Sequence, residues 1–234
     1  KMTNEISMTQ AAENSIAPPL HDEILAGIRE MIFTGALIGG QRVPEKMICE
    51  QLSISRTPLR EALKVLASEG LLELLPNRGA RVSRLTAAEV DEMFPVMGAL
   101  EGLAGEIACQ RISDDGIDEI RALHYQMAAH HKRREFSEYF GLNQQIHENI
   151  MAATGNATLA IMYASLAARI RMARYRANFS QSRWDQAMAE HDEILSALTE
   201  RDGPRLTRVL SAHLKNTCET VKKVIFNAEA EEAP

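Results

Sequence analysis

The stretch SRTPLREALKVLASEGLLELLPNRGARVSR, which covers residues 55–84, decides the fold of the N-terminal part of the chain. Ser55 is a natural N-cap for a helix over residues 56–69, and Gly70 is a natural stop for that helix. Residues 71–84 hold two short strand candidates on either side of a Pro-Asn-Arg-Gly turn, a pattern that predicts a β-hairpin. The stretch therefore predicts a helix that is followed directly by a hairpin.

Two further helices are expected before this stretch. Apolar residues at helical spacing predict a first helix over about residues 20–34, and Pro44 opens a short helix over residues 45–52. A tight turn over residues 53–55 then leads into the third helix. This order of elements is the plan of a winged helix-turn-helix, in which the third helix enters the major groove and the hairpin reaches an adjacent groove. We expect this domain to cover residues 18–84.

Polar and basic side chains on these elements are candidates for contacts with operator DNA. Arg56 and Arg60 share a face of the third helix, and an arginine in the major groove can grip guanine in a bidentate pair worth about 1–3 kcal/mol of discrimination. The start of a helix also attracts phosphate. The two arginines taken alone would fit a solvated helix, but the ordered set of elements favours DNA. The predicted contacts are Lys46, Ser55, Arg56, Thr57 and Arg60, with Asn77, Arg78 and Gly79 at the tip of the hairpin.

Residues 20–84 resemble the DNA-binding domain of GntR-type bacterial transcription regulators. The resemblance is carried by SRTPLREAL at 55–63, by EGL at 69–71 and by PNRGA at 76–80. It implies that the contacts on the second and third helices lie in the major groove or on phosphates, and that the hairpin tip lies in the minor groove. Ser53 departs from the family, which usually has glycine there, and a side chain at this position tightens the bend between the helices.

Composition and charge narrow the class of the protein. The 234 residues are 45% hydrophobic and 25% charged, and no apolar run approaches the ~18 residues of a membrane span. Residues 1–15 have no apolar core, so they do not resemble a secretory signal. The three cysteines are far apart, which fits a protein of the reducing cytoplasm. We therefore expect a cytoplasmic protein that has no membrane partner. The net charge of −6 falls entirely on residues 85–234. Residues 42–84 carry 8 basic and 5 acidic groups, and this local excess of positive charge can attract the phosphates of a nucleic acid.

The rest of the chain is expected to be helical, so the protein as a whole is mainly α. After a linker at residues 85–87, helical patterns with short connections predict an all-α helical bundle over residues 88–228. Residues 1–17 are expected to form a disordered tail, and residues 229–234 a second tail. We expect a homodimer, because winged-helix regulators read two half-sites.

Three histidines in this second half are candidate metal ligands. His147, His191 and His213 lie on three different predicted helices, each beside apolar residues at helical spacing. All three can therefore face the interior of the bundle, where three imidazoles would suit a divalent metal. The alternative is that each histidine makes only an ordinary core hydrogen bond.

Residues 88–226 resemble the FCD type of helical domain, which is shared with fatty-acid-responsive regulators of the GntR class. The resemblance rests on an Asp/Asn-x3-His pair that is followed by two single histidines. It implies zinc or nickel held by Asn143, His147, His191 and His213. Asn143 stands where many members have aspartate, and it is a neutral and weaker ligand. The metal would then keep its full +2 charge and invite an anionic ligand.

Arg169 is the candidate for binding that anion. It lies in a predicted inner stripe with Leu159, Met162, Leu166 and Ala173. A buried unpaired charge is costly, and a guanidinium pairs with a carboxylate through two parallel hydrogen bonds. An internal salt bridge is the alternative.

The sequence thus predicts a transcription regulator, by family habit a repressor, whose helical domain binds a metal and a small carboxylate effector that changes operator affinity. The runner-up is a metal-dependent enzyme with an accessory DNA-binding domain, in which the histidines would hold a catalytic water. No general base accompanies the histidines at motif spacing, so we do not expect an enzyme. A purely structural metal is a third possibility.

Overall fold

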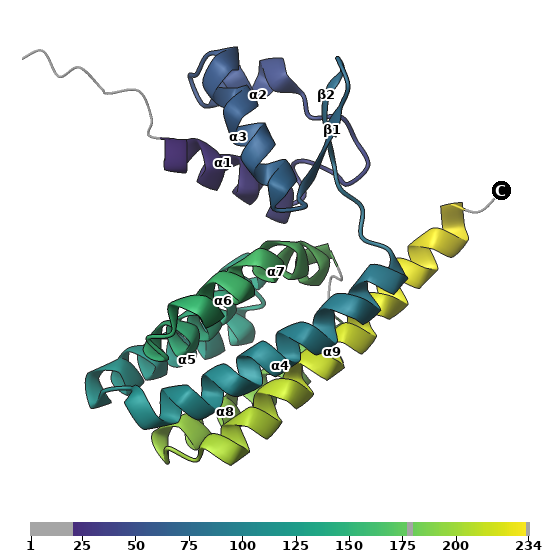
Figure 1. The fold of residues 1–234 in the computed structure, drawn as a ribbon. Coiled ribbons are helices and arrows are strands. Elements are labelled where there is room, and N and C mark those ends of the chain that lie inside the picture. Colours follow the sequence, from purple (N-terminus) through teal and green to yellow (C-terminus); the bar gives the residue numbers. More distant parts are fainter. Residues whose placement is uncertain (1–20, 177–179, 233–234) are drawn as a thin grey trace, which may run out of the picture.

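The computed structural model describes residues 21–176 and 180–232, with side chains described in 21–175 and 180–225. The predicted tail at residues 1–17 lies outside these ranges. The described chain forms two parts (Figure 1), a small N-terminal domain above a longer helical bundle. This confirms the predicted fold class, a winged helix-turn-helix joined to an all-α domain.

The N-terminal domain has the predicted order of helix, short helix, turn, helix and hairpin. The strands pair antiparallel, with Leu72 opposite Val82 and Leu75 opposite Gly79. A core of fully buried apolar residues, which includes Ile28, Ile48 and Leu59, holds the three helices together. The elements are α1 (His21–Phe33), α2 (Glu45–Gln51), α3 (Arg56–Ser68), β1 (Leu72–Leu75) and β2 (Gly79–Val82).

The turn before α3 is strained where the sequence departs from glycine. Ser53 has φ +54°, the left-handed region that side chains disfavour. This agrees with the tight bend expected at that position. Ser55 occupies the N-cap position of α3, as predicted, but its hydroxyl makes no capping hydrogen bond.

A third extended segment lies along the free edge of β2. Arg42 and Arg81 form an isolated antiparallel bridge. On either side of this bridge, the amide of Gly40 donates to the carbonyl of Val82 over 2.7 Å, and the amide of Val43 donates to the carbonyl of Ala80 over 2.9 Å. The chain leading into α2 therefore runs beside the hairpin and is positioned by it.

Six helices form the second domain in the described residues, and they cover the predicted bundle except that its C-terminal end lies further along the chain. There α9 continues to Glu232, so the tail expected at residues 229–234 is wrong for residues 229–232. At the other end, Thr86 and Glu89 form a capping box, and Ala87 of the predicted linker is already the first residue of the helix. The helices are α4 (Ala87–Arg111), α5 (Asp114–Arg133), α6 (Phe136–Ala153), α7 (Ala157–Arg176), α8 (Gln181–Thr199) and α9 (Gly203–Glu232).

The long helices α4 and α9 lie side by side along the bundle (Figure 1). Glycines on α4 permit this close approach: a Cβ on Gly105 would lie 2.8 Å from Cδ1 of Leu210, and one on Gly102 would lie 3.1 Å from Oγ of Ser211. None of the helices between His21 and Glu232 is both long and apolar enough to cross a membrane.

Candidate nucleic-acid interface and metal centre

The predicted DNA contacts on α2 and α3 are exposed. Arg56, Thr57 and Lys46 are open to solvent, as is Arg60, whose Nε lies 3.6 Å from Oε2 of Glu45. At 3.6 Å the pair is loose and its arginine is exposed, so Arg60 can exchange Glu45 for a DNA group at small cost.

Arg60 and the hairpin tip face a common cleft. Arg60, Asn77 and Gly79 are among the residues that line a cleft of about 440 Å³ between α3 and the hairpin. Gly79 has φ +78°, and a Cβ there would lie 2.6 Å from Oε1 of Glu45, so glycine lets the hairpin close against α2. The structure therefore brings Arg60 together with two of the three predicted tip residues, Asn77 and Gly79, on one side of the hairpin.

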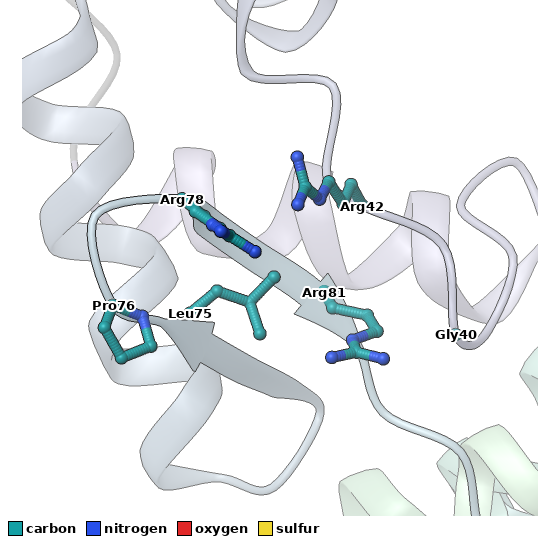
Figure 2. A pocket seen from close by; sticks show the side chains of 6 residues that line it. All are labelled: Gly40, Arg42, Leu75, Pro76, Arg78 and Arg81. Carbon is teal, nitrogen blue, oxygen red and sulfur yellow. The ribbon is translucent and has the colours of Figure 1, made fainter.

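The opposite side of the hairpin carries a second cleft that the sequence did not predict. It has a volume of about 550 Å³, and the side chains of Arg42, Arg78 and Arg81 lie around Leu75 (Figure 2). Of these arginines, only Arg78 was a predicted contact. Arg42 and Arg81 are brought together by strand pairing between segments far apart in the sequence, which no local pattern shows.

In the bundle, the three predicted histidines meet at one place. His147 on α6, His191 on α8 and His213 on α9 are buried, with ligand nitrogens within 4.8 Å of one another. Their ring centroids are 5.0 to 5.3 Å apart. Three imidazoles from three helices thus converge on one buried point.

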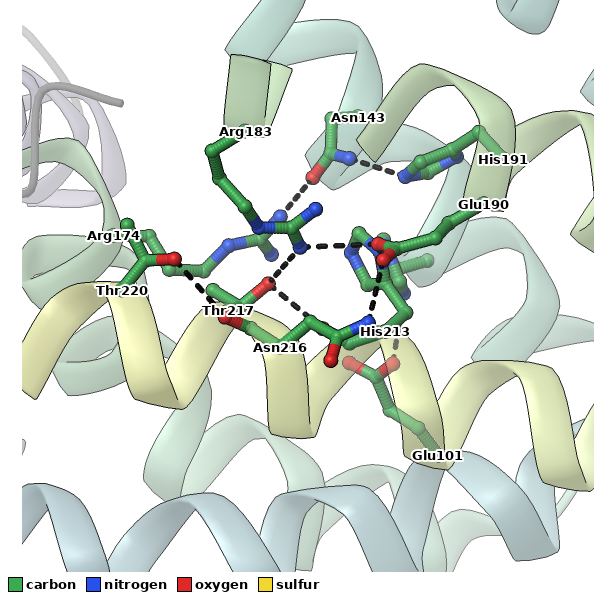
Figure 3. Close-up of polar contacts among 11 residues, drawn as sticks. Glu101, Asn143, Arg174, Arg183, Glu190, His191, His213, Asn216, Thr217 and Thr220 are labelled. Atoms are coloured by element: carbon green, nitrogen blue, oxygen red, sulfur yellow. Dashed lines mark hydrogen bonds and ion pairs between the residues drawn. The ribbon is translucent and has the colours of Figure 1, made fainter. Parts of the chain in front are cut away.

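Two glutamates, the buried Glu101 and the half-buried Glu190, orient two of these rings (Figure 3). Nδ1 of His147 donates to Oε2 of Glu101 over 2.9 Å, and Nδ1 of His213 donates to Oε2 of Glu190 over 2.7 Å. In both rings Nε2 is buried and has no hydrogen-bond partner among the described residues. In a neutral ring, a carboxylate that accepts from Nδ1 fixes the tautomer in which Nε2 can bind a metal, which is the arrangement found at metal-bound histidines.

Electrostatics at this centre favours neutral imidazoles. Burial lowers the pKa of His191 and of His213 well below the ordinary value, and neighbouring positive groups lower both further. Because a metal binds only the neutral ring, these two side chains are kept in the form that can act as ligands.

Asn143 lies with the histidines, but its oxygen points elsewhere. Its Oδ1 accepts from Nη2 of Arg174 over 2.5 Å, while its amide nitrogen contacts Nε2 of His191 (Figure 3). Asn143 is therefore next to the predicted metal position, although the oxygen that would coordinate a metal is engaged by Arg174.

Arg169 does not lie beside the histidines, and it forms an internal salt bridge, which is the alternative given above for this residue. Its Nη2 forms an ion pair with Oε1 of Glu89 over 2.5 Å, and its stem packs against Gly70 of the N-terminal domain. The predicted stripe is confirmed only in part, because Leu159 and Ala173 are buried whereas Met162 is 52% exposed. Among the described side chains of α7, the buried arginine is Arg174.

Arg174 and Arg183 were missed as candidate site residues. Arg174 is buried, and its hydrogen-bonding partner is the neutral Asn143, with the Phe140 ring 5.3 Å away. Arg183, at the start of α8, donates from Nη2 to Glu190 and to Thr217, each over 3.0 Å. The sequence signal for Arg174 is an arginine within an apolar helical pattern, and the prediction assigned that signal to Arg169 instead.

A winged helix-turn-helix with an exposed basic recognition helix, joined to a helical bundle, defines a DNA-binding transcription regulator. Comparisons with known families give the particular group. The profile described as "Bacterial regulatory proteins, gntR family" matches residues 20–82, and that of the FCD domain matches residues 92–216. The chain belongs to the GntR family and carries its FCD domain.

Individual relatives agree with this assignment. The chain is similar to the HTH-type transcriptional repressor RspR of Escherichia coli K12, with 25% identity over 93% of this chain and 95% of the relative. It is also similar to a probable D-xylose utilization operon transcriptional repressor of Paenarthrobacter nicotinovorans, with 28% identity over 86% of each chain. The solved structure of E. coli McbR/YncC has the same fold, with a TM-score of 0.80 and 20% identity over 87% of this chain and 97% of that one.

Proposed function

We propose that this GntR-family regulator binds a divalent metal, zinc or nickel, at His147, His191 and His213, and a small carboxylate effector beside it. Effector binding then changes the affinity for operator DNA. The observation that carries the proposal is the pair of buried imidazoles, each oriented by a glutamate on Nδ1 and each left with an unpartnered Nε2. Leaving such groups unpaired in an interior is costly, and a metal at their point of convergence would satisfy them.

The carboxylate is supported by Arg174. Its guanidinium is buried, and no carboxylate of the described side chains lies within 4.0 Å of it. Burial of a charge without a counter-charge is unfavourable, and an anion that reaches both the metal and Arg174 would relieve it. Because the three histidines are neutral ligands, the metal also retains its full positive charge. Both features favour a ligand that carries at least one carboxylate.

Asn143 links the two binding events. Its oxygen can serve Arg174 or a metal, and the present side-chain orientation serves Arg174. Coordination of a metal by this oxygen would release the guanidinium for the effector. A metal in the site would supply a positive charge and open coordination positions for the carboxylate, while Arg174 would orient that carboxylate.

The helix that carries Arg174 also contacts the DNA-binding domain. On α7, Arg169 pairs with Glu89 near the linker, while Arg171 pairs with Glu30 over 3.6 Å and lies over the ring of Phe33, both on α1. An effector that stabilises one position of α7 would therefore favour one arrangement of the DNA-binding domain. In a homodimer, the spacing of the two recognition helices would change. The repressors among the relatives favour repression as the output.

Metal content and ligand-dependent stability test the proposal. We expect about one zinc or nickel ion per chain after reconstitution and removal of free metal, measured by elemental analysis. His213→Ala should lose this ion, whereas His21→Ala, an exposed histidine on α1, should keep it. A screen of small carboxylates should then raise Tm in the metal-loaded protein and change its affinity for selected operator DNA. Equal metal content in both variants would contradict the site, and metal-dependent turnover of a carboxylate would favour the enzyme instead.

A further inference from the structure

We propose that Arg42, Arg78 and Arg81 form a phosphate-binding surface on the outer side of the hairpin. With Arg60 and Asn77 on the inner side, this surface would let the hairpin contact the phosphates of both strands that border the minor groove. The proposal rests on DNA binding by the winged-helix domain, and it adds Arg42 and Arg81 to the residues assigned to that function.

Strand pairing places the two new arginines next to each other. Arg42 and Arg81 are directly opposite in the antiparallel bridge along the edge of β2. Directly opposed residues in an antiparallel pair project from the same face, with Cβ atoms about 4.5–5.5 Å apart. Arg78 follows at the turn, and all three side chains line the cleft around Leu75 (Figure 2).

The charges on this face are not balanced. Arg42 and Arg78 form no side-chain hydrogen bond or ion pair with any described residue. Arg81 has Glu73 across the strand, with Nε 3.6 Å from Oε2, and this buried Nε has no hydrogen-bond partner in the described chain. Like charges directly opposite in a sheet cost about 0.2–1 kcal/mol. An anion in the cleft would offset this repulsion and accept the unused hydrogen bonds.

The position of the cleft indicates that the phosphate belongs to DNA. The hairpin separates this cleft from the one lined by Arg60 and Asn77, so that basic or polar groups lie on both of its sides. The minor groove is about 6 Å wide and has a phosphate strand along each edge. A hairpin in that groove therefore has one strand beside each of its faces. The two clefts match this geometry, whereas contacts with base edges alone would not require arginines on the outer side.

Salt dependence of DNA binding tests the assignment. Duplexes selected from a random library by the wild-type protein would be titrated between 0.05 and 0.3 M salt (roughly the range over which phosphate contacts dominate). We compare the full-length wild type with Arg42→Gln, Arg81→Gln and the double variant. Arg208→Gln is the matched control, because Arg208 is exposed on α9 in the bundle. Each substitution on the hairpin side should weaken binding about 3- to 10-fold and lower the slope of log K against log salt by about 0.9 per DNA-binding domain bound.

Several outcomes separate this surface from its alternatives. The selected sequence should stay the same in the hairpin variants, because phosphate contacts carry no base preference. A slope equal to that of Arg208→Gln would overturn the proposal. Calorimetric binding of inorganic phosphate that is lost in Arg42→Gln, together with an unchanged DNA slope, would also overturn it and would assign the cleft to a small phosphate ligand.

Failure of operator recognition gives a different result. If the wild-type protein selects no sequence from the library, it has no sequence-specific operator binding. The salt slope on a mixed-sequence 30-bp duplex (about three helical turns) would still report phosphate contacts by Arg42 and Arg81. The variants keep exposed side chains at exposed or half-buried positions, and an unchanged Tm confirms that they are folded.

Discussion

Arg174 donates from Nη2 to Oδ1 of Asn143 over 2.5 Å, so a buried cation is hydrogen-bonded to a neutral amide that lies beside three histidines. Family members with aspartate at this position would place a carboxylate there instead. The pairing makes Asn143 the residue on which metal affinity and effector affinity are expected to trade against each other.

Asn143→Asp should therefore raise metal affinity and lower effector affinity. A carboxylate is a stronger ligand than an amide for a divalent metal, and it would also neutralise Arg174. We expect zinc to bind about 10-fold tighter or more, measured by competition with a chromogenic chelator. The same change at Asn149, which lies further along α6 in a surface groove, should leave zinc affinity unchanged. Weaker zinc binding in Asn143→Asp would contradict the role given to this side chain.

Glu101→Gln should weaken the metal site without removing a ligand. The carboxylate holds Nδ1 of His147, and in the proposed site it would strengthen Nε2 as a donor to the metal. Loss of such outer partners typically costs about 10- to 100-fold in metal affinity, which the same competition assay would detect. Glu106→Gln, an exposed change on the same helix, is the control. Equal zinc affinity in the two variants would show that the glutamate does not tune the site.

The metal-free protein should lose stability as the pH falls below the ordinary histidine pKa of about 6.5. Burial holds the folded pKa of His191 and His213 well below that value, so the unfolded chain takes up protons that the folded chain does not. Each histidine should contribute a fall of about 1.4 kcal/mol per pH unit in the free energy of unfolding below this pH. Urea unfolding between about pH 5 and 7 measures the slope, and His191→Gln should reduce it. An unchanged slope in that variant would count against neutral burial.

Ser53→Gly should stabilise the N-terminal domain. Ser53 has φ +54°, where a residue with a side chain is strained and glycine is not. We expect the free energy of unfolding to rise by about 0.5–1 kcal/mol, measured by chemical denaturation of the full chain. Ser55→Gly is the matched control, because Ser55 has φ −82° and should gain nothing from glycine. A gain of equal size at both positions would show that backbone strain at Ser53 is not the cause.

Arg171→Ala should reduce communication between the domains and leave the metal site intact. Its guanidinium contacts Glu30 and the ring of Phe33 on α1, while its helix carries Arg174. We expect unchanged zinc content and a smaller ratio of operator affinities with and without a carboxylate effector, measured by fluorescence anisotropy. Arg121→Ala, a change on α5 that does not touch the N-terminal domain, is the control. An unaltered ratio would mean that α7 does not transmit the signal through this contact.

The sequence predicted most of the fold because its signals are local. The N-cap at Ser55, the stop at Gly70 and the Pro-Asn-Arg-Gly turn each act within a few residues. The metal candidates His147, His191 and His213 were found because each lies in a clear apolar pattern. Their glutamate partners were not predicted, because contact between α4 and α6, or between α8 and α9, depends on how the helices pack.

The choice of Arg169 has a similar cause. Helix α7 is apolar on more than one face, with Ile161 71% exposed and Met162 52% exposed. Such a pattern does not define the phase of the buried face, so it did not single out Arg174, which projects about 140° away from Arg169 around the helix. The surface at Arg42 and Arg81 could not be predicted from the sequence, because the bridge joins two segments that lie 39 positions apart.

The close packing at Gly105 has a consequence for how mutations in this protein are interpreted. Any side chain at position 105 would collide with Leu210, which lies one helical turn before His213 on α9. If α9 shifts to relieve this contact, His213 moves with it, so a methyl group on α4 would weaken the proposed metal site from a distance. A genetic screen for metal loss would therefore recover Gly105 together with the histidines, although glycine offers a metal no ligand atom from a side chain.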